Sequence, residues 1–171
     1  PSFSHILTAF NNPLVGVLAG AIITAVIQSS AASIGILQSL SITGHITYGM
    51  AIPIIMGQNI GTCVTALISS IGVNRSARRV AVIHIAFNCI GTIILLPILY
   101  LVNAFVDFVF MDWTISYAGI ALVHTIFNVV VTFLLLPFSK LLEKLAYLVI
   151  KRLPEETQKE QLILPGEILL N

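Results

Sequence analysis

Two clusters of uncharged polar side chains interrupt apolar stretches in the first half of the chain. The first, Gln28-Ser29-Ser30, lies inside the apolar stretch 14–40, and the second, GQNIGTCVT at 57–65, lies inside the stretch 50–71. Amide and hydroxyl oxygens are neutral ligands that suit a sodium ion. A helix that restarts after Ser30 would also aim its N-terminal N–H groups at the first cluster, which suits an anion. The two clusters therefore predict a polar site for ions built from neutral groups.

The same residue types also serve helix packing, so a second interpretation stands beside the first. Small polar side chains commonly form hydrogen bonds between membrane helices, and this role suits the triplet at 28–30 as well. Residues 57–65 carry more polar groups than packing requires, and Thr62 and Thr65 present both hydroxyls on one helical face. Two pairs of glycines have the spacing of close helix contacts, Gly16 with Gly20 and Gly57 with Gly61.

Two later segments carry a histidine followed four positions later by an asparagine. They are His84–Asn88 in IHIAFN and His124–Asn128 in VHTIFN, 40 positions further on. This spacing puts both side chains of a pair on one helical face. The histidines could relay protons or pair with each other, although hydrogen-bonded packing is the more usual role for such groups. We expect Asn88 and Asn128 to form hydrogen bonds across helices.

The composition places the chain in a membrane. Of its 171 residues 57% are hydrophobic and 9% are charged, and residues 1–74 contain no Asp, Glu, Lys or Arg. Soluble domains average about 25% charged residues and disordered chains need low hydrophobicity, so both classes are excluded. The net charge of +1 excludes a general nucleic-acid binder, which needs a basic face. An enzyme is not expected either, because Ser29 has no activating base near it in the sequence.

Two stretches read directly as membrane spans. Stretches 80–102 and 114–136 carry no formal charge, and each exceeds the roughly 20 residues that one crossing needs. Arginines at 75–79 precede the first span, basic residues at 140–152 follow the second, and the loop between the spans is acidic. Basic residues collect on the cytoplasmic side of membranes. We therefore expect both basic groups in the cytoplasm and the acidic loop outside.

The stretches before these spans are less regular. Stretches 14–40 and 50–71 could each be one crossing broken at mid-depth, and the first could equally be a re-entrant hairpin with its tip at 28–30. Non-helical backbone inside a membrane survives only where protein or a water-filled cavity shields it. An anion bound within residues 1–74 meets no Arg or Lys, so helix ends, hydroxyls and a co-bound cation must neutralise it. This requirement favours an ion-coupled secondary transporter.

The end of the chain has a different character. Residues 140–152 combine mixed charge with apolar spacing, which suits an interfacial helix at the cytoplasmic surface. We expect a transmembrane transporter unit at 1–139. Residues 140–171 are then an interfacial helix and a tail that leads towards a further C-terminal domain.

Three runs of sequence, VIQSSAASIGILQSL, MGQNIGTCVTALISSIG and NRSARRVAVIHIAFNCIGT, closely resemble the type II sodium-dependent phosphate cotransporters and their bacterial relatives. The resemblance implies an all-α polytopic membrane protein with broken or re-entrant helices, built from two inverted repeats. This chain looks like the second repeat. It would then be a fragment, one chain of a split protein, or a unit that pairs with a second repeat or with another copy of itself. In bacterial members a PhoU-like helical domain often follows the transmembrane part.

The resemblance also implies which residues bind the ions. In the family the second Gln-Ser-Ser element and two threonines after Asn-Ile-Gly form a sodium site, which here is Gln28, Ser29, Ser30, Thr62 and Thr65. Phosphate is held between the tips of the repeats, so Ser29 and Ser30 are expected to contact it too. Gln58 and Asn59 are expected to support the site. Ala31 stands where many members have a third serine, so one oxygen of the family pattern is missing.

The resemblance thus predicts sodium-coupled transport of inorganic phosphate by alternating access, with sodium as a co-transported ion. A plasma membrane or a bacterial inner membrane is the expected location, with several crossings. Two alternatives stay open. One is a transporter of the same fold for another anion or with another coupling ion, and the other is a membrane subunit that does not transport.

Overall fold

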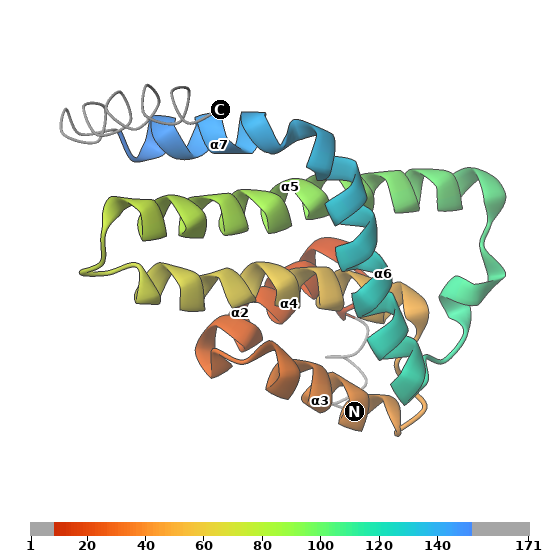
Figure 1. The fold of residues 1–171 in the computed structure, drawn as a ribbon. Helices are drawn as coiled ribbons and strands as arrows, with labels where there is room; N and C mark the ends of the chain where they lie inside the picture. The colour runs from red at the N-terminus through yellow and green to blue at the C-terminus, as the bar shows by residue number, and fades with distance from the viewer. Residues whose placement is uncertain (1–8, 152–171) are drawn as a thin grey trace, which may run out of the picture.

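The computed structural model describes residues 9–151, and these are almost entirely helical (Figure 1). In chain order the elements are α2 (Pro13–Ile27), α3 (Ser30–Ser41), α4 (Tyr48–Ser69), α5 (Arg75–Val106), the 3-10 helix η1 (Val109–Asp112), α6 (Tyr117–Leu135), the 3-10 helix η2 (Leu136–Phe138) and α7 (Ser139–Val149). Within residues 9–151 the sole β-type pairing is one isolated bridge between Thr47 and Thr114. The predicted all-α class is confirmed.

Three helical segments are long and apolar enough to cross a membrane: Tyr48–Ser69, Arg75–Val106 and Tyr117–Val149. The predicted span 80–102 lies inside α5. The predicted span 114–136 corresponds to α6, which begins at Tyr117 because Ser116 caps it by accepting a hydrogen bond from the N–H of Gly119. The chain is a multi-pass membrane protein.

The apolar stretch 14–40 folds as a hairpin of two helices. Gln28 ends α2 in the left-handed conformation with φ of 58°, and the hydroxyl of Ser29 caps α3 by accepting from the N–H of Ala32 at 3.3 Å. Thr24 and Ser33 would be about 13 Å apart in a continuous helix, yet their hydroxyl oxygens are 2.7 Å apart. The chain therefore turns back at 28–29, as a re-entrant hairpin does (Figure 1).

The stretch 50–71 does not break as the sequence suggested. Residues 57–65 lie in the continuous helix α4, which also accommodates Pro53. The glycines there serve a close contact with α2, because a Cβ on Gly57 would overlap the carbonyl of Val17 and one on Gly20 would overlap the carbonyl of Ile54. The expectation of small-residue packing at both glycine pairs is confirmed. The expectation of a second broken crossing is wrong, since these glycines allow α2 and α4 to approach closely without interrupting the helix.

The basic start of α5 is fastened to the end of α7. The guanidinium of Arg79 donates to the carbonyls of Ile150 at 3.1 Å and Lys151 at 3.2 Å, and Arg75 donates to that of Lys151 at 2.7 Å. Arg79 also lies over the ring of Tyr147, 4.5 Å from its centroid. These contacts satisfy carbonyls at a helix C-terminus, and α7 runs beside the first half of α5 (Figure 1). The arginines at 75–79 and the basic residues between 140 and 151 therefore lie at the same end of the molecule.

The assignment of residues 140–171 to a cytoplasmic interfacial helix and tail stays a prediction, and its last part lies outside the described residues.

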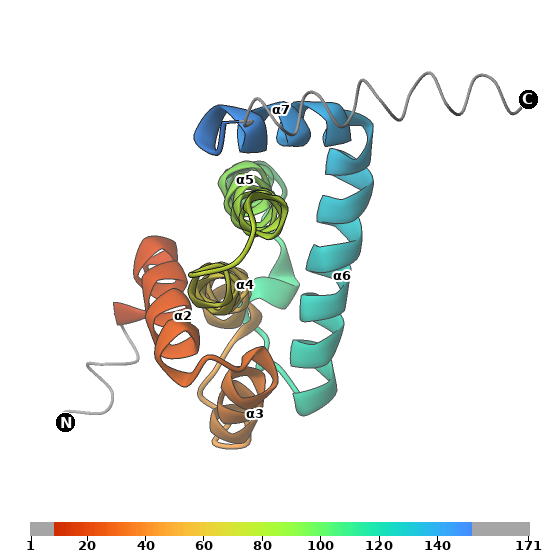
Figure 2. The same ribbon diagram turned by 60° about the vertical axis from the view of Figure 1, so that its left-hand side comes forward.

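Helix α6 takes a different direction from α4 and α5. It crosses both steeply in Figure 1, and in Figure 2 α4 and α5 are seen end-on while α6 runs across the view. The side chain of Val131 in α6 fits against Gly91 in α5, where a Cβ would meet it at 2.6 Å. This crossing brings the His-Asn faces of α5 and α6 towards α4.

Candidate ion-binding site

A polar cavity of about 250 Å³ lies where α3, α4, α5 and α6 meet. Its lining has no formally charged residue and consists of Ser30, Asn59, Thr62, His84, Phe87, Asn88, His124 and Asn128. Helices α4, α5 and α6 each contribute residues at helical spacing. Asn59 and Thr62 are three apart on α4, and each His-Asn pair is four apart, so every set faces the same way. Ser30 is the first residue of α3, so the positive end of that helix dipole lies at the cavity wall.

The orientation of every asparagine amide in this cavity is determined by its own helix. Each side-chain Nδ2 donates to the carbonyl four residues back, from Asn59 to Ile55 at 2.9 Å, from Asn88 to His84 at 3.1 Å and from Asn128 to His124 at 2.8 Å. A carbonyl oxygen can only accept. The nitrogen end of each amide must therefore be the end that lies on the helix backbone.

Two of these amides also link helices. Nδ2 of Asn128 in α6 donates to Oδ1 of Asn59 in α4 at 3.3 Å. Nδ2 of Asn88 in α5 reaches Sγ of Cys63 in α4 at 3.5 Å. The expectation that both asparagines bond across helices is confirmed. Nδ2 of Asn128 also lies 3.3 Å from Nε2 of His124.

The predicted site residues divide into two groups. Ser30, Thr62 and Asn59 line the polar cavity, whereas Gln28, Ser29 and Thr65 do not. Gln28 is exposed at the end of α2 and the Ser29 hydroxyl caps α3. The hydroxyls of Thr62 and Thr65 donate to the carbonyls of Gln58 at 2.9 Å and Thr62 at 2.7 Å, so their oxygens keep lone pairs for another partner.

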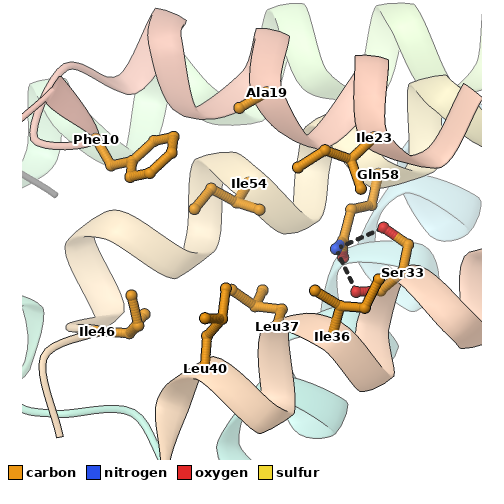
Figure 3. A pocket seen from close by; sticks show the side chains of 10 residues that line it. All are labelled: Phe10, Ala19, Ile23, Ser33, Ile36, Leu37, Leu40, Ile46, Ile54 and Gln58. Carbon is orange, nitrogen blue, oxygen red and sulfur yellow. Dashed lines mark hydrogen bonds between the residues drawn. The ribbon is translucent and has the colours of Figure 1, made fainter. Parts of the chain in front are cut away.

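Gln58 fastens the α2–α3 hairpin to α4. Its side chain is 3% exposed, and its Nε2 donates to the carbonyl and the hydroxyl of Ser33 at 3.0 and 2.9 Å (Figure 3). The hydroxyl of Ser33 in turn accepts from Thr24. Oε1 of Gln58 has no partner within the described residues. The second cavity beside it, about 160 Å³, is lined mainly by apolar side chains such as Ile23 and Leu37 and offers no comparable polar groups (Figure 3).

The sequence favoured hydrogen-bonded packing for His84, Asn88, His124 and Asn128, with proton relay left open for the two histidines. The structure places all four in the same cavity as Ser30 and Thr62. The signal that could have identified them is the repeated His-x-x-x-Asn spacing on two uncharged spans. Each pair taken alone resembles ordinary packing. Their convergence depends on the crossing of α6 over α4 and α5.

Comparison with known proteins agrees with the sequence patterns. The model of the family described as Na+/Pi-cotransporter matches residues 1–119. The chain is 38% identical over 90 residues to the uncharacterized protein YqeW of Bacillus subtilis, and 38% identical over 94 residues to rat sodium-dependent phosphate transport protein 2A. It is 31% identical over 88 residues to YjbB of Escherichia coli, named as a candidate inorganic phosphate export protein.

These matches cover 53%, 52% and 52% of this chain, and 29%, 15% and 16% of the respective relatives. The chain therefore spans less than a third of each. No solved structure matches this fold. Since the family model covers more than half of the chain, the chain belongs to the Na+/Pi-cotransporter family, which is a family of membrane transporters and not of enzymes.

Proposed function

We propose that the protein carries out sodium-coupled transport of inorganic phosphate, and that this chain supplies one of two repeats. The observation that carries the proposal is the uncharged polar cavity, which collects oxygen and nitrogen ligands from α3, α4, α5 and α6 inside a membrane protein. The name of the matching family and that of the rat relative support sodium and phosphate as the ions.

The absence of charge in the cavity lining explains why the two ions would bind together. An anion there meets the positive end of α3 and hydroxyl groups, and no lysine or arginine lines the cavity. A co-bound sodium ion supplies the missing positive charge, and each ion then raises the affinity for the other. We assign phosphate to Ser29 and Ser30. We assign sodium to the oxygen ligands of the family pattern, which are Gln28, Ser29, Ser30, Thr62 and Thr65.

Transport requires that this site open to the two sides in turn. We propose alternating access, in which sodium binds first, orders the tip of the α2–α3 hairpin, and makes a place for phosphate. Sodium can shift the two conformations only by binding one of them more tightly. The exposed tip at Gln28 needs a shield at membrane depth, and a second repeat or another copy of the chain would provide it.

The test is phosphate uptake by proteoliposomes that contain the full-length gene product, with an inward sodium gradient. The matched control replaces sodium with choline. We expect uptake with sodium and none with choline, and competition by arsenate but not by sulfate. Equal uptake in both salts would contradict sodium coupling. Competition by sulfate as strong as that by phosphate would replace phosphate with a broader class of anion.

A further inference from the structure

The polar cavity presents oxygen atoms where its amides could have presented N–H groups. The side-chain nitrogens of Asn59, Asn88 and Asn128 are all bound to carbonyls of their own helices. Their oxygens are therefore the ends that can accept another partner. Oδ1 of Asn59 accepts from Asn128. Within residues 9–151 no donor reaches Oδ1 of Asn88 or of Asn128.

The burial of Asn88 gives weight to this observation. The residue is 3% exposed, yet its oxygen is not sealed in the protein interior, so the polar cavity that it lines is where a partner can reach it. The oxygen of Thr62 faces the same cavity after giving its proton to the carbonyl of Gln58. The hydroxyl of Ser30 lines the cavity without a partner among the described residues. Four oxygen ligands from α3, α4, α5 and α6 are thus available at one place.

We infer that Asn88 and Asn128 are ligands of the coupling cation, and that Thr62 and Ser30 complete the oxygen set. Amide and hydroxyl oxygens are the ligands of hard cations. Sites for divalent ions rely on carboxylates, and the cavity lining contains neither Asp nor Glu. A monovalent cation therefore fits better. Its identity as sodium rests on the proposed function.

This ligand set differs from the one that the family resemblance implies. It keeps Ser30 and Thr62 and adds one asparagine each from α5 and α6. It leaves out Gln28, Ser29 and Thr65, which do not line the cavity. It also gives the repeated His-x-x-x-Asn spacing a purpose. The carbonyl of each histidine holds the amide nitrogen of its asparagine and so turns the oxygen towards the ion.

The experiment measures binding of radioactive sodium to the purified full-length protein in detergent, without phosphate. Asn88→Ala and Asn128→Ala should each raise the sodium concentration for half-saturation about tenfold, the change that 1.4 kcal/mol produces. Asn88→Asp has nearly the same shape, keeps an oxygen at that position and adds a negative charge. An ionised aspartate loses the N–H bond to the carbonyl of His84, but its full charge attracts the cation, so this variant should lower the half-saturating sodium concentration.

The matched control is Asn103→Ala, which removes an amide from the same helix, outside the polar cavity. Oδ1 of Asn103 accepts a hydrogen bond from the N–H of Phe108 at 2.9 Å. Sodium binding by the Asn103→Ala variant should stay at the wild-type value. Opposite shifts for Asn88→Ala and Asn88→Asp cannot come from a general loss of folding. Wild-type sodium binding in both Asn88 variants, or an equal loss in both, would overturn the inference.

The result also separates this inference from the proposed function. A full-length protein that binds sodium through Asn88 and Asn128 but transports no phosphate would leave the inference standing and remove the proposed function. The opposite result is sodium-dependent phosphate uptake together with wild-type sodium binding in Asn88→Ala and Asn128→Ala. It would support the proposed function and overturn the inference.

Discussion

At the scale of single residues, hydroxyl and amide groups in this protein commonly bond to the backbone of their own helix. The hydroxyls of Thr62, Thr65 and Thr125 each donate to a nearby carbonyl of the same helix. The proton is thereby used and the oxygen keeps its lone pairs. Whether such an oxygen is a ligand depends on what it faces, and only Thr62 of these three lines the polar cavity.

Thr62→Val tests the sodium site at this scale. Valine has nearly the same shape, so it removes the oxygen from the cavity with little change in volume. We expect the sodium concentration for half-maximal phosphate uptake to rise about tenfold, equivalent to 1.4 kcal/mol, with little change in the unfolding temperature. Uptake by the full-length protein over a series of sodium concentrations measures this.

Thr125→Val is the matched control, because Thr125 makes the same kind of backbone bond at 2.9 Å on the exposed face of α6. Its sodium dependence should equal that of the wild type. If Thr62→Val also keeps the wild-type sodium dependence, Thr62 is not a sodium ligand.

At the scale of elements, the contact between α2 and α4 depends on the absence of side chains. A Cβ on Gly57 would overlap the carbonyl of Val17, and one on Gly61 would overlap the carbonyl of Ala21. Backbones this close gain dispersion energy along their whole contact. The same contact places Asn59 and Thr62, which follow Gly57 on α4, next to the tip of the hairpin.

Gly57→Ala should force α2 and α4 apart. Overpacking of a close contact costs about 1–3 kcal/mol, so we expect a lower unfolding temperature in detergent. The control is Gly35→Ala, since nothing lies within 4 Å of a Cβ at that position of α3. Alanine in a helix is favoured over glycine by roughly 0.5–1 kcal/mol, so this variant should be unchanged or slightly more stable. Equal effects of the two substitutions would contradict the close contact.

The elements could be predicted from the sequence only where the signal is local. Uncharged length identified the spans in α5 and α6, and glycine spacing identified a close-packing face on each of α2 and α4. The turn at Gln28 carries no glycine, although its φ is positive, so the sequence left open whether the stretch crosses or turns back. The polar residues of α4 suggested a break because each disfavours a lipid-facing helix. Instead, Gln58 bonds to the hairpin, Asn59 bonds to α6, and the threonine hydroxyls bond to carbonyls of α4 itself.

The candidate site was predictable in part for a similar reason. Ser30, Asn59 and Thr62 belong to motifs that stand out among apolar neighbours. Asn88 and Asn128 stand alone on long spans, and a lone asparagine in a helix is explained by a single hydrogen bond. Their common cavity arises from the angle at which α6 crosses, which is a property of tertiary packing that no spacing within one helix encodes.

At the scale of the whole molecule, the charged residues mark two opposite ends. Arg75 and Arg79 join the end of α7 at one side. Asp107 ends α5 at the other side, where η1 carries Asp112. Length and hydropathy allow α5 to cross a membrane between these ends, and the basic end is expected in the cytoplasm.

Cysteine labelling in intact cells measures this orientation. Arg78 and Asp112 are both exposed near opposite ends of α5. In a background without Cys63 and Cys89, Asp112→Cys should react with a membrane-impermeant maleimide from outside, and Arg78→Cys should react only after the cells are opened. The reverse pattern would invert the topology, and labelling of both residues from outside would exclude α5 as a crossing.

The attachment of the hairpin to α4 decides which parts can move during transport. The glycine contact and the buried bonds among Gln58, Ser33 and Thr24 join α2, α3 and α4. Helix α6 is attached unevenly. Near its N-terminal end Gln38 donates to the carbonyl of Tyr117 and Ile115 donates to that of Ile46, whereas at the polar cavity one side-chain hydrogen bond of 3.3 Å, from Asn128 to Asn59, joins α6 to α4. Helices α2, α3 and α4 should therefore travel as one rigid body. Helix α6 would then pivot about its anchored N-terminal end. The polar cavity would open and close during the transport cycle, and a bound ion would join α6 to the rigid body only while it is present.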